Sequence, residues 1–193
     1  VLEHGPASAR ASFFDIDWQP RKPELHGRAI LPILEDHFGR VLTGGLLRLQ
    51  LDAEQGTLAL HYWEHRFPLD PRTYPQVLAL SPDQAATLAA EDEVTAQEYR
   101  SLVDALAALP PRDDPDPAQL AARGRDQRVH KRRLARLLQD SPLLSRLVGE
   151  NLAALNGTPE QPETFTALGR LLEDQAWRLA FWRVAGDEIN YRR

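Results

Sequence analysis

Two runs of alternating apolar and polar residues constrain the fold of this chain most strongly. The apolar positions are Leu47, Leu49 and Leu51 in the first run and Leu58, Leu60 and Tyr62 in the second. Successive side chains of a strand point to opposite faces, so each run predicts a half-buried strand. The short loop between them contains Gly56, which favours a β-hairpin.

After residue 74 the apolar residues recur every three or four positions. Residues 81–84 (Ser-Pro-Asp-Gln) combine an N-cap serine, a proline at the first helical position and a glutamine that completes a capping box. A second capping box at 95–98 predicts the start of another helix, which the prolines at 110–111 end. Further helices are expected at about 118–139, from 141–142 to 156–157, and at about 163–184.

The rest of the chain is less regular. Residues 1–27 have little periodicity and are interrupted by proline and glycine, and residues 28–34 fit a strand or a buried turn. We therefore predict an α+β fold, mainly helical with four to five helices, an N-terminal irregular segment and one β-hairpin. Residues 1–75 are expected to form the irregular segment plus hairpin, and residues 76–193 a helical subdomain.

Composition excludes several classes of protein. The 193 residues include no cysteine, which removes disulfides and thiolate metal ligands. A net charge of −5 argues against a general nucleic-acid binder. The chain has no basic-then-apolar N-terminal signal and no apolar run near the roughly 18 residues that span a membrane. We expect a cytoplasmic protein with neither a nucleic-acid nor a membrane partner.

The histidines do not predict a metal site. His61 and His65 lie four residues apart, but on a strand this spacing separates them by roughly 13 Å. The sequence also lacks a glycine-rich phosphate loop and a Gly-x-Ser-x-Gly elbow. We therefore expect no metal and no cofactor.

A basic stretch runs through the third predicted helix. Its cations are Arg123, Arg125, Arg128, Lys131, Arg132, Arg133 and Arg136. Apolar residues at helical spacing lie between them, so the cations are expected on a solvated helix face. A phosphate-binding role would work against the acidic field of the whole chain.

Residues 176–193 concentrate aromatic side chains and arginines. Flat aromatic faces suit pyranose rings, and guanidinium groups suit hydroxyls, so Tyr191 and Arg192 are candidate sugar contacts. Asp187 and Glu188 are adjacent, whereas glycoside chemistry needs two carboxylates that face one bond across about 5–10 Å. Because adjacent side chains diverge, we expect this pair to orient an arginine or to cap the last helix rather than to catalyse.

Two other segments offer polar groups beside aromatic rings. In an extended segment, Asp15 and Asp17 face the same way beside Trp18 and could hold sugar hydroxyls. The alternative is a turn in which the carboxylates accept backbone N–H groups.

His65 and Arg66 follow the hairpin. They are candidate donors to a sugar or to a neighbouring carboxylate. The alternative is an internal ion pair of Arg66 with Asp70 or Glu64.

Four segments, taken together and in order, resemble one family. They are residues 13–18 (FFDIDW), 31–34 (LPIL) with the hairpin, 62–74 (YWEHRFPLDPRTY) and 171–193 (LLEDQAWRLAFWRVAGDEINYRR), with Asn-Gly at 156–157. In this order they resemble the maltooligosyl trehalose synthases of the α-amylase superfamily. The resemblance spans the chain and is loosest between residues 80 and 150.

The resemblance implies a (β/α)8-barrel parent enzyme, an isomerase. Such enzymes convert the reducing-end α-1,4 linkage of a maltooligosaccharide into an α,α-1,1 linkage by a retaining mechanism. Their aspartate nucleophile and glutamate acid/base lie on later barrel strands, so no catalytic residue is assigned here. The chain resembles the insertion between the third and fourth strands, and its expected partners are the remainder of the barrel and a linear α-1,4-glucan. The substrate-binding residues it implies are Asp17, Trp18, His65, Arg66, Tyr191 and Arg192.

Two other interpretations remain open. The chain could be a free-standing helical interaction module that binds an acidic partner through its basic helix. It could also be a stand-alone glycosidase that uses Asp187 and Glu188. The resemblance instead predicts that the chain alone is catalytically inactive.

Overall fold

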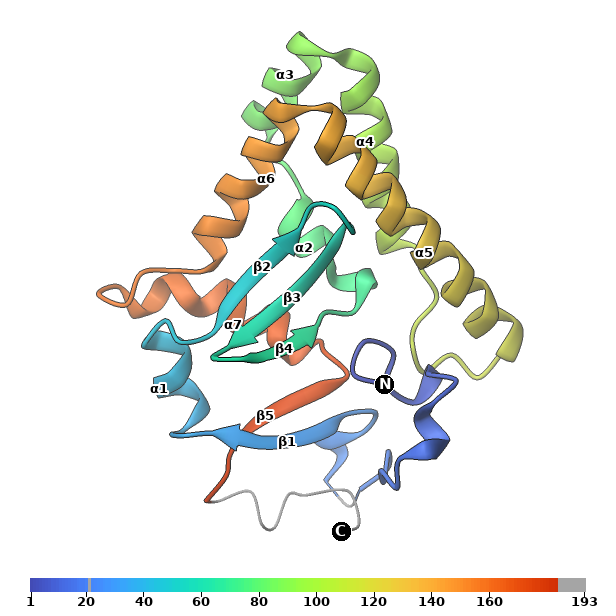
Figure 1. The fold of residues 1–193 in the computed structure, drawn as a ribbon, viewed down its shortest axis with the longest axis vertical. Coiled ribbons are helices and arrows are strands. Elements are labelled where there is room, and N and C mark those ends of the chain that lie inside the picture. Colours follow the sequence, from blue (N-terminus) through green and yellow to red (C-terminus); the bar gives the residue numbers. More distant parts are fainter. Residues whose placement is uncertain (21, 184–193) are drawn as a thin grey trace.

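The computed structural model describes residues 1–20 and 22–183, and these residues form an α+β fold (Figure 1). The α-helices of this part are α1 (Phe38–Thr43), α2 (Pro75–Leu78), α3 (Pro82–Glu91), α4 (Glu93–Ala107), α5 (Pro117–Asp140), α6 (Pro142–Leu155) and α7 (Thr166–Glu173). The strands are β1 (Ala29–Leu34), β2 (Arg48–Asp52), β3 (Thr57–Tyr62), β4 (His65–Pro68) and β5 (Trp177–Phe181). Short 3-10 helices occur at Gly5–Ala7, Ala11–Phe13, Pro23–Leu25, Pro71–Thr73 and Pro162–Phe165.

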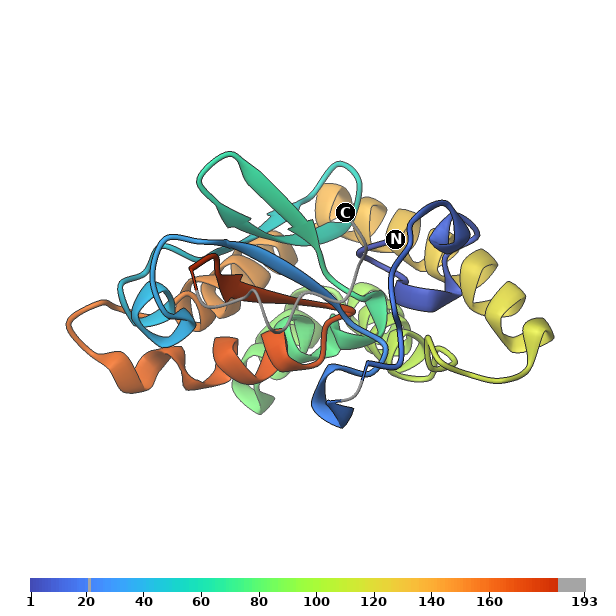
Figure 2. The ribbon, with the colours of Figure 1, turned by 90° about the horizontal axis from the view of Figure 1, so that it is seen from below.

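The predicted α+β class is confirmed, but the seven α-helices of the described residues exceed the predicted four to five. Two of the additional helices, α1 and α2, span six and four residues, which is too short to show a helical period. In Figure 1, α4, α5 and α6 frame the antiparallel sheet, and Figure 2 shows α2 and α7 on the opposite side of the molecule from that sheet.

The predicted hairpin is confirmed and gains a third strand. β2 and β3 pair antiparallel with Leu49 opposite Leu60, and β4 pairs with the other edge of β3. Leu58, Leu60 and Tyr62 are almost fully buried, as the alternation predicts. The turn into β4 places Trp63 at a φ of 52°, a left-handed conformation that a bulky residue rarely adopts.

The last predicted helix is wrong in its second half. The helix α7 ends at Glu173, and the chain continues as β5, which pairs in parallel with β1 from Ala29 opposite Trp177 onwards. The strand interpretation of residues 28–34 is therefore confirmed. The apolar residues of this segment have helical spacing, but parallel pairing with β1, which is distant in sequence, makes the segment a strand. The sequence alone could not reveal that pairing.

The helix starts are mostly as predicted. Ser81 and Gln84 form the expected capping box at α3, with Ser81 Oγ accepting from the Gln84 N–H at 3.3 Å. Ser141 caps α6 in the same way. The second predicted box is wrong: Asp92 caps α4, and its carboxylate accepts from the N–H groups of Val94 and Thr95. Asp92 is both the C-cap of α3 and the N-cap of α4, and the Thr95 hydroxyl donates to its carboxylate at 2.8 Å.

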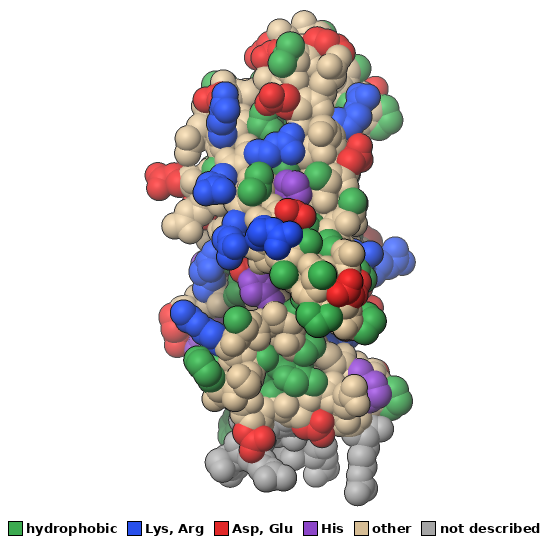
Figure 3. Space-filling view, turned by 90° about the vertical axis from the view of Figure 1, so that its right-hand side faces the viewer, with side chains coloured by type: hydrophobic (Ala, Val, Ile, Leu, Met, Phe, Trp, Pro, Cys, Tyr) green, Lys and Arg blue, Asp and Glu red, His purple; other side chains and the backbone are tan. Residues whose placement is uncertain are grey.

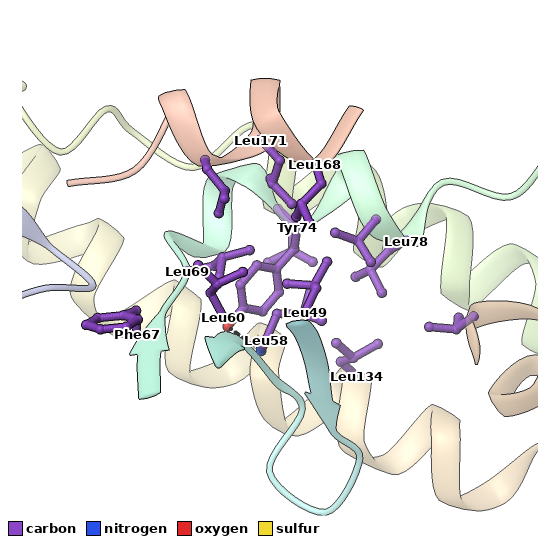
Figure 4. Close-up of a cluster of buried hydrophobic side chains, with 14 of the residues drawn as sticks. Leu49, Leu58, Leu60, Phe67, Leu69, Tyr74, Leu78, Leu134, Leu168 and Leu171 are labelled. Atoms are coloured by element: carbon purple, nitrogen blue, oxygen red, sulfur yellow. Dashed lines mark hydrogen bonds between the residues drawn. The ribbon is translucent and has the colours of Figure 1, made fainter. Parts of the chain in front are cut away.

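One hydrophobic cluster includes side chains from Leu34 to Leu179, drawn from both sheets and most helices. Tyr74 lies in this cluster among leucines of β2, β3, α2, α5 and α7 (Figure 4). Its hydroxyl accepts from the Leu58 N–H at 3.0 Å, so the ring packs against the leucines while its oxygen pairs with a strand. Burial raises the pKa of the Tyr74 phenol, so it stays protonated. This contact fixes the start of α2 on the sheet.

Candidate functional site

Trp18 lines a hollow of about 500 Å³ between the N-terminal segment and the loop that joins α4 to α5. Gln19 and His26 face it from the N-terminal segment, and Asp113 and Asp114 face it from the loop. An aromatic face with amide, imidazole and carboxylate groups around it is the set of groups that binds a sugar ring and its hydroxyls. We call this the Trp18 hollow.

Local hydrogen bonds hold Trp18 in place. Its carbonyl accepts from the Gly27 N–H at 2.8 Å, so the loop between these residues is closed at its base. The Asp17 carboxylate accepts from the Gln19 N–H at 2.9 Å, which is the turn that the sequence left as an alternative. Asp17 therefore shapes the loop, and Trp18 is the one of the two that lines the hollow.

The far wall of the Trp18 hollow is anchored by Arg112. Its guanidinium donates to the carbonyls of Asp174 at 2.7 Å and Gln175 at 3.2 Å, and lies 3.3 Å from the Asp70 carboxylate. A planar fork with several partners is well suited to hold a loop in one geometry. The loop that carries Asp113 and Asp114 is thus fixed to the body of the protein.

Arg112 belongs to a buried cluster that we call the Asp70 cluster, formed by Asp70, Arg112, Arg123 and Gln175. Asp70 and Arg123 form an ion pair with side chains only 3% and 2% exposed. Arg123 also donates to the Pro110 carbonyl at 2.6 Å, and Gln175 Oε1 accepts from the Asp70 N–H at 2.8 Å. The expectation that Arg123 lies on a solvated helix face is therefore wrong. The Pro110 carbonyl and the Asp70 carboxylate pair with its two terminal nitrogens in the interior, whereas its Nε has no hydrogen-bond partner among the described residues.

His65 and Arg66 lie on β4 and are exposed. The ring of His65 lies 3.8 Å from the Glu64 carboxylate, and Arg66 donates to the Thr57 hydroxyl at 3.2 Å. The alternative that the sequence left open, an ion pair of Arg66 with Asp70 or Glu64, does not form among the described residues. Asp70 is paired inside the Asp70 cluster, and the Glu64 carboxylate lies beside His65.

The structure does not bring all the predicted site residues together. Arg66 lines a different hollow from Trp18, and His65 lines neither. Tyr191 and Arg192 lie outside the described residues, as do Asp187 and Glu188.

The α4–α5 loop contributes to the Trp18 hollow, although no role was expected for it. The sequence predicted only that a helix ends at the prolines at 110–111, whereas Asp113 and Asp114, which follow them, face the Trp18 hollow. Two adjacent carboxylates in a loop that prolines stiffen could have indicated a binding role, because loops on rigid scaffolds often carry function.

Within residues 1–20 and 22–183, no group of three or more His, Cys, Asp or Glu side chains could hold a metal ion. None of the helices in this range combines the length and apolar character needed to cross a bilayer. Comparison with family models, curated proteins and solved structures finds no match for the chain. The proposal below therefore depends on the site and on the sequence resemblance.

Proposed function

We propose that this chain is a module of a maltooligosyl trehalose synthase and forms one wall of the subsites that bind the reducing end of a linear α-1,4-glucan. The observation that carries the proposal is spatial. Three of the four segments that resemble this family lie far apart in sequence but meet at one place in the fold, whereas α3 and α4, in the region of loosest resemblance, form the opposite end (Figure 1).

Three of these segments are in direct contact. Residues 31–34 lie in β1 and pair with β5, which belongs to the last segment. The Trp177 ring packs 5.3 Å from the ring of Phe67, and its indole N–H donates to the Pro68 carbonyl at 3.0 Å. Arg112 connects this region to the wall of the Trp18 hollow through Asp70 and the Gln175 carbonyl.

The parallel β1–β5 pair supports a place within a larger protein. Both strands lack a second strand partner among the described residues. Parallel strands occur mostly in larger sheets covered on both faces. The rest of the barrel would supply the neighbouring structure and the catalytic carboxylates.

The chemistry of the proposed reaction requires such a wall. The leaving glucose must stay bound and be kept from water, so that its own anomeric hydroxyl attacks the enzyme-bound sugar. An aromatic face such as Trp18 can hold that sugar while the polar groups of the Trp18 hollow bind its hydroxyls. The chain itself would be catalytically inactive, since the nucleophile and the acid/base would lie in the barrel.

The test is calorimetric titration of the chain with maltopentaose. Trp18→Ala should weaken binding by roughly tenfold or more, because the ring supplies the stacking face. Trp63→Ala is the matched control, since Trp63 is 62% exposed and does not line the Trp18 hollow. Equal binding by the Trp18→Ala and unmodified chains would refute the proposed site, and trehalose-capped product from the chain alone would refute its inactivity.

A further inference from the structure

A second hollow, of about 450 Å³, lies between α5 and the antiparallel sheet. Arg66 faces it from β4, and Arg128, Lys131 and Arg132 face it from α5. Glu3 is the one carboxylate in its lining, so the net charge of the lining side chains is +3. We call it the cationic hollow, and Figure 3 shows the Lys and Arg side chains that gather on this face of the molecule.

A close backbone contact joins the two sides of the cationic hollow. Gly56, in the β2–β3 turn, adopts a φ of 61°, and a Cβ added there would lie 2.0 Å from the Lys131 carbonyl oxygen. The turn therefore rests directly on the backbone of α5, a contact that only glycine allows. Thr57, next to Gly56, accepts a hydrogen bond from Arg66 at 3.2 Å and orients its guanidinium. The cations of the helix and of the sheet are thus held at a set separation.

The pairing of these cations leaves three of them for a ligand. Glu3 forms an ion pair with Lys131. Within the described part of the chain, Arg66, Arg128 and Arg132 make no ion pair, in contrast to Arg136 on the same helix, which pairs with Asp140 at 3.3 Å. Three guanidinium groups from two elements therefore face one concave space, and the one carboxylate in its lining is paired with Lys131.

We propose that the cationic hollow binds a phosphoryl group, either as inorganic phosphate or as the phosphate of a small metabolite. The net charge of the chain is −5, which opposed such a role in the sequence, but the lining side chains of the cationic hollow carry a net charge of +3. Guanidinium forks match phosphate geometry and form charge-assisted hydrogen bonds to its oxygens. A hollow of about 450 Å³ has room for a phosphate or a small phosphorylated molecule. This binding is independent of glucan binding, because the Trp18 hollow shares no lining residue with the cationic hollow.

The test is calorimetric titration of the full chain at fixed ionic strength with three probes: inorganic phosphate, a hexose phosphate and an acidic peptide that lacks phosphate. Saturable binding of phosphate or of the hexose phosphate is expected. Tighter binding of the hexose phosphate would identify a phosphorylated metabolite as the ligand, and equal binding would identify the free anion. Binding of the acidic peptide alone would overturn the proposal in favour of a protein partner.

Variants locate the site. Arg66→Gln and Arg132→Gln should each weaken phosphate binding by roughly tenfold, because each removes a charge-assisted contact. Arg125→Gln is the matched control: Arg125 lies on the same helix and is exposed, but it does not line the cationic hollow. Glu3→Gln should tighten binding several-fold, since it removes the competing carboxylate from Lys131. Circular dichroism confirms that each variant is folded, and if one is not, the other arginine variant tests the site. Equal weakening by Arg125→Gln, or a response that does not saturate, would overturn the proposal.

Discussion

The Asp70 cluster and the cationic hollow use the same residue type on the same helix in opposite ways. The Arg123 side chain, on α5, is 2% exposed, and its guanidinium donates to a carboxylate and a carbonyl. Arg128 lies little more than one helical turn further along, is exposed and faces the cationic hollow. Both belong to one continuous basic stretch in the sequence. An arginine that other elements cover stabilises the fold, and one that they leave open can face a ligand; its neighbours in the sequence do not decide between the two.

Asp70→Ala should break this comparison with the largest effect. It leaves the buried guanidinium of Arg123 and the partly buried one of Arg112 without their shared carboxylate, and breaking a buried ion pair costs about 3–5 kcal/mol. We expect the free energy of unfolding, measured by urea denaturation, to fall by that amount. Asp113→Ala, at an exposed position of the α4–α5 loop, is the control and should change stability by less than about 0.5 kcal/mol. A loss below about 1 kcal/mol for Asp70→Ala would contradict a structural role for the Asp70 cluster.

Gly56→Ala should have an intermediate effect, on the cationic hollow rather than on the Asp70 cluster. The added methyl group would collide with the backbone of Lys131, so the turn and α5 must separate. Overpacking of this kind costs about 1–3 kcal/mol, measurable by thermal unfolding. The variant should also weaken phosphate binding, since the separation of the cations changes.

Gly149→Ala is the matched control for Gly56→Ala and should change stability in the opposite direction. Gly149 lies within α6, and a Cβ added there meets no atom within 4 Å. Gly149→Ala should therefore stabilise the protein by about 0.5–1 kcal/mol through helix propensity. If both glycine variants behaved alike, the contact between the turn and α5 would not be the cause.

The smallest effect on stability is expected from a change of pH that titrates His4, whose pKa responds both to Arg123 of the Asp70 cluster and to Lys131 of the cationic hollow. Burial lowers the pKa of His4 despite the nearby Glu3 carboxylate, and Lys131 and Arg123 add to the decrease. A histidine whose pKa is lower in the folded state binds fewer protons when folded, so stability should decrease as the pH falls through about 6.5. Urea denaturation between pH 5 and pH 8 measures this slope. His4→Gln should flatten it, and an unchanged slope would assign the effect to other groups, such as His61 and His130, whose pKa values burial also lowers.

Some elements of the fold were predictable from local sequence. The alternation of Leu58, Leu60 and Tyr62 predicted the hairpin correctly, because these three side chains share the strand face that packs on the core. The α3 and α6 starts were also predicted, because capping depends on residues close in sequence.

Other features could not be predicted. The apolar spacing around Trp177 fits a helix as well as a strand, and only the pairing of β5 with β1 decides between them. In the candidate site, Trp18 was predicted, but the carboxylates that face it come from a loop nearly a hundred residues away, at Asp113 and Asp114.

Local sequence signals therefore predicted the hairpin, the start of α3, the bounds of α5 and α6, and the α+β class. Tertiary structure alone decided the parallel sheet, the burial of Arg123 beside Asp70 and the two hollows. The two groups of features differ in the sequence separation of the residues on which they depend. Caps and alternation depend on neighbours in the chain, whereas strand pairing and the burial of a charge depend on partners that only the folded chain brings into contact.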